Sequence, residues 1–472
     1  MAQFKLDPNA VSALYLAIII KDFDVNTASK RGQWSSRFTF ILAATGSAVG
    51  LGNIWKFPYI TGEYGGGAFV LVYICCIALV GIPMVMAEIM IGRSGRSSPS
   101  DSFKALSEQH QLSPHWSAAG GIGVFAAFLV LSFYSVIGGW SIAYLKHALF
   151  GGFSGSDAAG IDTLFTELVN DPVTVIGWHT VFILLAVVVV AKGVNKGIEK
   201  TVSLLMPAMF VLLLLLVAYA ATTPGFGQSL QFLFSFDASK LTAEGVLQAL
   251  GHAFFTLSLG MAIMLAYGSY LGDDVSITRT AIAVSMLDTL VALLAGIAIF
   301  SVVFSNDLVA SAGPGLVFQT LPLAFGQMPA GQLLSIFFFV MLLFAAWSSA
   351  ISITEPSVAQ LIQRFNISRV RATVLVTLGA WSLGVVAALS FSVLSVVQLL
   401  ERSIFDFLDY ITTNIMIPLG CMVTALFCGW ALPRASSQQA LGLSDGPFKL
   451  WLFLMRYITP VLIAIVFIFN LS

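Results

Sequence analysis

Asp288 is a carboxylate in the middle of a long apolar stretch of the sequence. The segment 286–290 carries no other charge, and the nearest charged residues are Arg279 and Asp307. Burying a carboxylate in such surroundings costs several kcal/mol unless it is paired or neutralised. A cation, a proton or a lysine would meet that requirement. We therefore predict that Asp288 binds a positively charged partner.

Two other apolar segments are interrupted by small and hydroxylated residues. The first is 46–53 (GSAVGLGN) and the second is 255–261 (FTLSLGM). Glycines in membrane helices often serve close helix packing, and that reading stays open for either segment alone. Exposed backbone at this depth is otherwise tolerated only where it lines a cavity or binds something. Two interruptions, each in the first of five spans, indicate an inverted-repeat transporter with a midplane site.

The pair Ser348 and Ser349 adds two adjacent hydroxyls to a very apolar segment. Serine hydroxyls can simply bond back to a carbonyl one turn earlier. They are also hard oxygen ligands that suit an alkali cation. His252 lies close to the second interruption, and we favour a packed or water-bonded imidazole there over a proton-coupling role. The sequence shows no nucleophile–base set, phosphate loop or metal spacing, so we predict no enzymatic activity.

The composition requires that these residues be held by membrane-spanning elements. Of 472 residues, 58% are hydrophobic and 10% are charged, with a formal net charge of -1. Soluble domains carry about 25% charged residues. This composition excludes a soluble globular enzyme and leaves no basic surface for nucleic acid. The chain is expected to cross a lipid bilayer several times.

A bilayer core requires about 20 apolar residues per helix. On that basis we predict an all-α membrane protein with eleven transmembrane helices, near 38–62, 67–92, 119–147, 173–191, 198–220, 241–270, 278–305, 331–361, 371–391, 398–431 and 448–470. Most Lys and Arg residues then fall on the side of the N-terminus, while the loop 148–172 is acidic. Cytoplasmic loops are enriched in Lys and Arg, so the N-terminus is predicted inside and the C-terminus outside.

At the interrupted helices the chain closely resembles the neurotransmitter:sodium symporter family, which has the bacterial leucine-transporter-like fold. Four segments in order carry the resemblance: 46–58 (GSAVGLGNIWKFP), 65–69 (GGGAF), 81–93 (GIPMVMAEIMIGR) and 254–260 (FFTLSLG). The resemblance implies a 5+5 inverted repeat with broken helices 1 and 6. It divides the chain into a cytoplasmic segment 1–36, repeats 37–220 and 221–431, and an inner loop with helix 11 in 432–472. It also implies a multi-pass protein of a bacterial inner membrane.

The resemblance implies two sodium sites built only from oxygen ligands. The first would use Ala48, Asn53, Thr256 and Asp288, with the substrate carboxylate completing the shell. The second would use Gly46, Val49, Ala345, Ser348 and Ser349, and it lacks a formal charge, which suits releasable binding.

The resemblance places an amino acid substrate between the two interruptions. The amides of Leu51 and Gly52 and the hydroxyl of Tyr134 would face its carboxylate, while carbonyls near Ala48, Phe255, Thr256 and Ser258 would bind its ammonium. The side-chain pocket would be lined by Ser47, Val130, Phe255, Ser258, Met261, Ser349 and Ile353. A mainly uncharged pocket favours aliphatic or aromatic side chains.

Two positions refine the expected substrate and ions. Monoamine carriers of the family have an aspartate at the position of Gly50, so glycine there implies a substrate that brings its own carboxylate. Members that require chloride have a neutral residue in place of Asp288, so a fixed carboxylate implies independence of chloride.

The resemblance also implies two gates. Tyr134 and Phe255 would form an outer lid, and Lys56 with Asp409 an outer ion pair, although two separately solvated charges remain an alternative. Arg31 and Trp34 resemble an N-terminal latch. The expected acidic partner of Arg31 is replaced by Gln363, with Glu355 as a possible substitute. Gly197 and Pro207 match a family feature for local unwinding near the second sodium site.

Together these features predict a sodium-coupled, chloride-independent importer of hydrophobic amino acids that works by alternating access. Two alternatives stay open. A proton-coupled carrier of the same fold would use Asp288 or His252, and a sensor would bind an amino acid without transporting it. The preferred amino acid, the number of coupled sodium ions and the oligomeric state are left open by the sequence.

Overall fold

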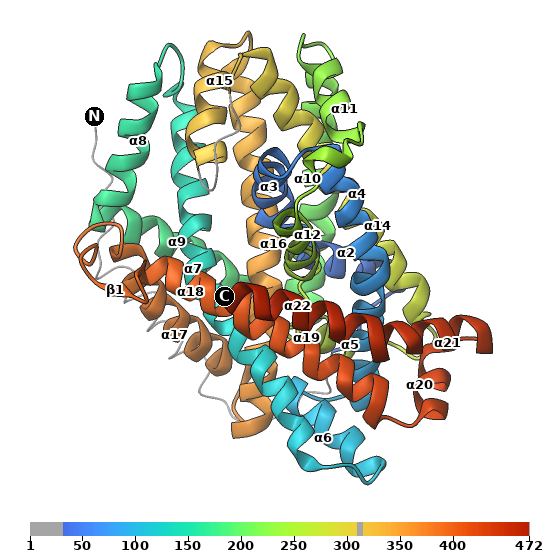
Figure 1. Ribbon diagram of the computed structural model, residues 1–472. Coiled ribbons are helices and arrows are strands. Elements are labelled where there is room, and N and C mark those ends of the chain that lie inside the picture. The colour runs from blue at the N-terminus through green and yellow to red at the C-terminus, as the bar shows by residue number, and fades with distance from the viewer. Residues whose placement is uncertain (1–31, 309–314, 472) are drawn as a thin grey trace.

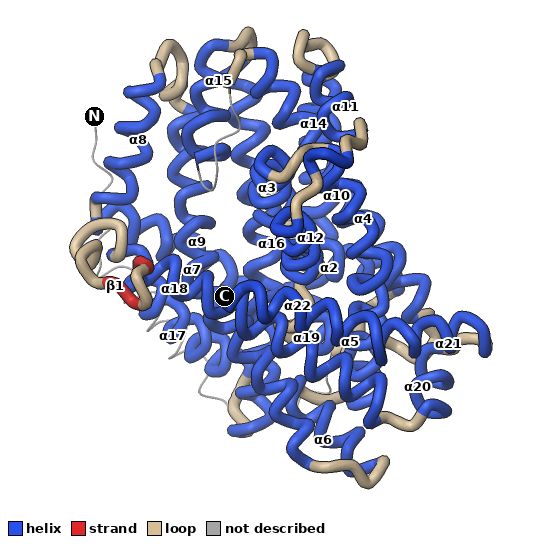
Figure 2. Tube along the Cα trace, viewed as in Figure 1, coloured by secondary structure: helices blue, strands red, loops and turns tan. Residues whose placement is uncertain are grey.

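The structure is a computed structural model that describes residues 32–308 and 315–471. Helices make up most of it, as Figure 2 shows. Nine helical stretches among the described residues are long and apolar enough to cross a membrane, judged by length and composition. An apolar helix satisfies all its backbone hydrogen bonds internally, which is why such segments fold as helices in lipid.

Five of these stretches lie in the first part of the chain. They are α4–η2–α5 (Gly67–Cys76, Ile77–Gly81, Ile82–Gly95), η3–α7 (Pro114–Trp116, Ser117–Leu149), α9 (Pro172–Val190), η4–α10 (Val194–Glu199, Lys200–Ala220) and α14 (Ile277–Ser305). The other four are α16 (Gly331–Phe365), α17 (Arg369–Leu389), α18–η7–α19–η8 (Ile404–Tyr410, Ile411–Met416, Ile417–Leu426, Phe427–Ala431) and α21–η9–α22 (Asp445–Phe453, Leu454–Ile458, Thr459–Leu471).

The two remaining predicted spans are the interrupted ones. Helix α2 (Arg37–Ala48) is followed by η1 and α3 (Gly52–Lys56, Phe57–Glu63), and this pair is bent by 50°. Helices α12 (Ala243–Thr256) and α13 (Ile263–Gly268) are separated by six residues without regular helix. Both breaks fall where the small and hydroxylated residues predicted them.

Shorter elements connect the spans. They are α6 (Pro99–Gln109), α8 (Ala158–Asn170), α11 (Phe226–Phe234), η5 (Ala238–Lys240), η6–α15 (Leu316–Thr320, Leu321–Gln327), α20 (Arg434–Leu441) and a hairpin of β1 (Gln398–Leu399) with β2 (Arg402–Ser403). The hairpin corrects one prediction, because the tenth span begins at Ile404 and not at residue 398. Leu400 and Glu401 adopt positive φ angles, which turn the chain back where a helix was expected.

Local sequence signals explain several helix starts. The Ser36 hydroxyl accepts a hydrogen bond from the backbone of Thr39, and the Thr39 side chain bonds back to the Ser36 backbone, which forms a capping box. Ser276 caps α14 and Ser368 caps α17 in the same way, through their hydroxyls. Each cap satisfies a backbone N–H that would otherwise lack a partner at the helix start.

The broken helices lie in the middle of the bundle. Figure 1 shows α2, α12 and α16 there, with α8, α11 and α15 toward one end of the molecule and α6 and α20 toward the other. Helix α7 packs against α9, α16 and α17. Gly138 and Gly139 allow this close approach, because a Cβ on Gly138 would lie 2.4 Å from the Phe182 ring.

Candidate functional site

The first break lies at Val49–Leu51, and the Asn53 side chain binds the backbone of the break. Val49 leaves the helical conformation, with φ -73° and ψ 105°. The Gly50 amide, freed from the helix, donates to Asn53 Oδ1 at 3.1 Å. The carbonyl oxygens just before the break are therefore free to bind other groups.

The second break, Leu257–Ala262, has a more unusual backbone. Ser258, Gly260 and Ala262 have φ angles of 56°, 71° and 56°. For residues other than glycine such angles cost roughly 1–2 kcal/mol each. A Cβ on Gly260 would lie 2.3 Å from the carbonyl oxygen of Ile417, so only glycine fits this position.

Glu88 on α5 supports the second break. Its side chain is buried, and Oε1 accepts a hydrogen bond from the Gly260 amide at 2.8 Å. Glu88 lies within the segment 81–93, and the local sequence does not assign it a role. The available signal was the one used for Asp288, a carboxylate in an apolar span.

Asp288 is fully buried and accepts hydrogen bonds from three side chains. Asn53 Nδ2 donates to Oδ1 at 2.8 Å, Thr256 Oγ1 lies 3.1 Å from Oδ1, and Tyr73 donates to Oδ2 at 3.3 Å. None of the three ion pairs among the described residues includes Asp288. Neutral donors bring no positive charge, so the carboxylate is suited to a cation or a proton. A lysine partner, one of the three options from the sequence, does not occur within the described residues.

Ser349 lies against the first break from the opposite side. Its hydroxyl is 3.4 Å from the carbonyl oxygen of Gly46 and 3.3 Å from those of Ser47 and Val49. One hydroxyl hydrogen cannot serve three acceptors at once. Ser348 Oγ lies close by in sequence and bonds to the Ala345 carbonyl at 3.0 Å. This surplus of oxygen acceptors over donors is the ligand environment that a hard cation prefers.

A cavity lies between the two breaks. All twelve residues predicted to bind substrate line it, together with Gly50: Ser47, Ala48, Leu51, Gly52, Val130, Tyr134, Phe255, Thr256, Ser258, Met261, Ser349 and Ile353. The Leu51 amide points at the Tyr134 hydroxyl, 3.4 Å away. A Cβ on Gly50 would lie 2.5 Å from Ser349 Oγ, so glycine keeps this cavity open.

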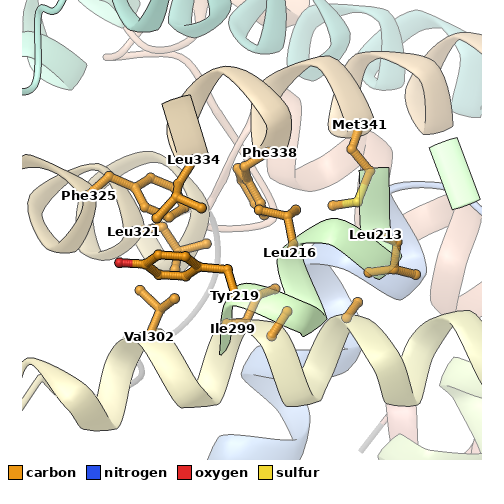
Figure 3. Close-up of a pocket in the computed structure, with 12 residues that line it drawn as sticks. Leu213, Leu216, Tyr219, Ile299, Val302, Leu321, Phe325, Leu334, Phe338 and Met341 are labelled. Atoms are coloured by element: carbon orange, nitrogen blue, oxygen red, sulfur yellow. The ribbon is translucent and has the colours of Figure 1, made fainter. Parts of the chain in front are cut away.

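A second cavity between α10, α14, α15 and α16 is different in character. Figure 3 shows that aliphatic and aromatic side chains line it, among them Leu216, Phe338 and Met341. Its polar atom, the Tyr219 hydroxyl, already donates to the Pro329 carbonyl at 2.9 Å. Such a lining offers nothing to the charged ends of an amino acid. Of these two cavities, the one between the breaks combines polar backbone with an apolar wall.

His252 packs beside the Asp288 cluster without joining it. Its ring lies 5.4 Å from the Tyr73 ring and 6.0 Å from the Phe57 ring, measured between centroids. Neither ring nitrogen has a hydrogen-bond partner among the described residues. The geometry gives His252 a packed position, in line with the favoured expectation for it.

At one end of the cavity Lys56 and Phe255 are in contact. The Lys56 ammonium lies 4.7 Å from the centroid of the Phe255 ring. The predicted ion pair with Asp409 is not formed among the described residues in this conformation. Asp409 Oδ1 instead accepts a hydrogen bond from Thr413 at 3.0 Å.

At the other end of the cavity Trp34 is bonded to the backbone of α13 and of the residues that follow it. Its indole Nε1 donates to the Tyr267 carbonyl at 3.0 Å, and its amide donates to the Tyr270 carbonyl at 3.2 Å. The next residue, Ser35, bonds to both carboxylate oxygens of Glu199 on η4. Arg31, predicted to share this latch, lies outside the described residues.

Gln363 and Glu355, the two positions considered opposite Arg31, both contact described residues. Gln363 Oε1 accepts from the Ser98 amide at 2.9 Å. Glu355 is buried, forms an ion pair with Arg369 and accepts from the Tyr270 hydroxyl at 2.8 Å. Nothing in the local sequence distinguishes Arg369, at the start of α17, from the other arginines near helix ends, so its role could not be predicted.

Gly197, near the Trp34 end, packs closely against the backbone of α9. A Cβ there would be 2.0 Å from the Val189 carbonyl oxygen, so η4 folds this tightly only with glycine. In this structure residues 194–199 are wound as a π-helix. Helix α10 then packs on the first break, with Met206 and Val202 against Gly46.

Comparisons with known proteins agree with this architecture. The profile of the Sodium:neurotransmitter symporter family matches residues 31–154 and 168–472. A relative from Bacillus subtilis, named the sodium-dependent transporter YhdH, is 39% identical over 440 residues, covering 92% of this chain and 97% of its own length. A sodium-dependent transporter of Haemophilus influenzae is 34% identical over 450 residues, covering 94% of this chain and 98% of its own.

The crystal structure of MhsT in complex with L-phenylalanine has a similar fold. The TM-score is 0.86 at 43% sequence identity, covering 93% of this chain and 99% of MhsT. The predicted fold class is thereby confirmed, and the family and structural neighbours are transporters and not enzymes. This chain belongs to the sodium:neurotransmitter symporter family and is a sodium-dependent, multi-pass membrane transporter.

Proposed function

We propose that this chain imports hydrophobic amino acids, aliphatic or aromatic, together with sodium and without a need for chloride. The observation that carries the proposal is the cavity between the breaks, where free backbone groups meet an apolar wall. Amides at a helix break bind a carboxylate, and carbonyls bind an ammonium. The rest of the lining, with Val130, Met261 and Ile353, then selects an uncharged side chain.

The two oxygen clusters are the proposed sodium sites. Ala48, Asn53, Thr256 and Asp288 would form the first, and the substrate carboxylate would complete it. Because substrate and sodium would share that shell, each would raise the affinity for the other. Gly46, Val49, Ala345, Ser348 and Ser349 would form the second. The Ser349 hydroxyl among three carbonyl oxygens supports that assignment.

Transport would proceed by alternating access around this site. The Lys56 end would open to the outside and the Trp34 end to the cytoplasm. The N-terminus would then be cytoplasmic and the C-terminus external, in a bacterial inner membrane. The distribution of Lys and Arg supports this orientation. The bound L-phenylalanine in the structural neighbour supports an amino acid as substrate.

Uptake into proteoliposomes tests the proposal. Labelled leucine and tryptophan would be offered with an inward sodium gradient or an equal potassium gradient. We expect accumulation only with sodium, and competition by other amino acids then ranks the substrates. Equal uptake in both gradients would favour proton coupling at Asp288. Sodium-dependent binding without accumulation would favour a sensor.

The Asp288→Asn substitution tests the charge argument about chloride. With the fixed carboxylate removed, we expect weaker uptake that depends partly on chloride. Uptake should therefore fall further when gluconate replaces chloride in the buffer. Glu167→Gln, an exposed acid on α8, serves as the matched control and should leave uptake independent of chloride. Strong, chloride-independent uptake by the Asp288→Asn variant would contradict the assignment.

A further inference from the structure

The segment 390–403, between α17 and α18, is an ordered apolar loop that no role described so far explains. Three turns fold it, with hydrogen bonds from Ser392 and Leu394 amides to the Leu389 carbonyl at 3.0 and 2.9 Å, and from Val397 to Leu394 at 2.9 Å. The hairpin follows, with Gln398 paired to Ser403 and Leu399 to Arg402. The loop therefore presents a defined surface.

Its base is fixed to the helix bundle by aromatic contacts. The Phe391 ring lies 5.5 Å from Trp140 and 5.1 Å from Phe405, measured between centroids. The Phe405 amide donates to the Ser390 hydroxyl at 3.3 Å. These contacts hold one side of the loop against α7 and α18, so the residues on its other side must point away from the protein.

Five apolar side chains of the loop are exposed, and the polar residues Ser395 and Gln398 are exposed between them. Val396 is 88% exposed, Leu400 75% and Val393 66%, and Val397 and Leu399 are exposed as well. Apolar side chains gathered on one exposed surface mark a contact with a partner or a membrane. Here the surface lies directly after a span, at the level where that span ends.

The exposed apolar residues of the loop come directly after α17, a helix that itself has an exposed apolar face. The exposed apolar residues of that helix, Leu375, Leu378 and Val386, recur at helical spacing along one face. Helix α17 is one of the membrane spans, so that face meets lipid. Val393 is exposed four residues past the end of α17, so the bilayer around that helix offers the nearest apolar surroundings for the loop.

Charge and backbone limit how deep the loop can lie. Glu401 is exposed in the turn of the hairpin, and a carboxylate is costly in the hydrocarbon core. The two-residue strands also leave backbone groups on their outer edges, which hydrocarbon cannot satisfy. Arg402 stays near the protein, with its guanidinium 4.3 Å from the centroid of the Tyr410 ring. The membrane interface meets all three conditions.

We propose that the loop 390–403 inserts its apolar surface into the membrane interface, against the upper acyl carbons of the lipids. Val393, Val396 and Leu400 enter the lipid, while Glu401 and Arg402 stay at headgroup level. The partner is the bilayer itself, and the loop anchors the start of α18 to it.

Spin-label accessibility in liposomes tests this placement. A nitroxide would be attached at Val396→Cys in a Cys75→Ala background, since Cys75 is the exposed native cysteine of the described residues. Relaxation by oxygen, which concentrates in lipid, would be compared with relaxation by a water-soluble nickel chelate. A matched label at Thr166→Cys, exposed on α8, reports a position in water.

We expect oxygen to dominate at Val396→Cys and nickel to dominate at Thr166→Cys, which gives depth parameters of opposite sign. Equal, nickel-dominated relaxation at both positions would overturn the proposal. Protection from both reagents, with dipolar broadening that grows with the protein-to-lipid ratio, would also overturn it and identify a second copy as the partner. Val396 is almost fully exposed, so its replacement leaves the packed base of the loop intact.

Discussion

The two ends of the cavity between the breaks are closed by different chemistry. At the Trp34 end a buried carboxylate, Glu355, meets Arg369, and an indole and an amide bond to carbonyls of Tyr267 and Tyr270. At the Lys56 end the Lys56 ammonium lies over the partly buried ring of Phe255. Buried polar contacts are specific and costly to break, whereas exposed ones are weak. The structure therefore represents a conformation closed firmly at the Trp34 end and lightly at the Lys56 end.

This difference fits the proposed carrier in a state that is ready to bind substrate from the Lys56 end. In the proposed transport cycle, a weakly closed Lys56 end would let substrate and sodium enter with little free-energy cost. In that cycle the Trp34 end would open only when binding elsewhere offsets the loss of several buried contacts. The following substitutions test this comparison, from the largest expected effect to the smallest.

Arg369→Ala should have the largest effect. It leaves the buried Glu355 carboxylate without its cation, a change that costs about 3–5 kcal/mol. We expect loss of uptake and a lower melting temperature in the presence of sodium. Both would be measured on purified protein in nanodiscs and proteoliposomes.

The double variant Glu355→Gln with Arg369→Gln is the matched control. It removes both charges, so no uncompensated charge remains buried. We expect it to be more stable than Arg369→Ala. If both variants melt at the same temperature, the ion pair does not hold this end closed.

Trp34→Phe should have an intermediate effect. It keeps an aromatic ring but removes the hydrogen bond to Tyr267, worth about 1 kcal/mol. We expect faster amide hydrogen exchange in the segment 33–36, by about fivefold, and unchanged exchange near Lys56. Faster exchange at both ends would mean that the two closures are not independent.

Lys56→Gln should have a small effect. A cation–π contact between partly buried groups contributes about 0.5–2 kcal/mol. We expect substrate to dissociate a few times faster, with thermal stability unchanged, as followed by release of labelled amino acid. Lys240→Gln, an exposed lysine on η5, is the control.

Asp409→Asn should have the smallest effect on binding in this conformation. Asp409 bonds to Thr413 on its own helix and does not pair with Lys56. Surface substitutions of this kind usually change stability within about 0.5 kcal/mol. A strong coupling between Asp409→Asn and Lys56→Gln in a double-mutant cycle of transport rates would show that the pair forms in another state of the cycle.

Much of this protein was predictable from local sequence. Long uncharged segments require spans, because lipid leaves the backbone no other way to satisfy its hydrogen bonds. The small residues at 46–53 and 255–261 located both breaks. Asp288 was identifiable as a site residue because a lone carboxylate in an apolar helix needs a partner.

Tertiary structure decided which distant groups meet. Glu88 supports a break 172 residues away in the sequence, and the orientation of α5 that allows this has no local signal. Likewise, Glu355 pairs with Arg369, Lys56 lies over Phe255, and residues 398–403 form a hairpin instead of a helix. Local sequence determines where a helix can form or break, since each residue acts there on its own neighbours. Which side chains face each other depends on how all the helices pack, and that is a property of the whole chain.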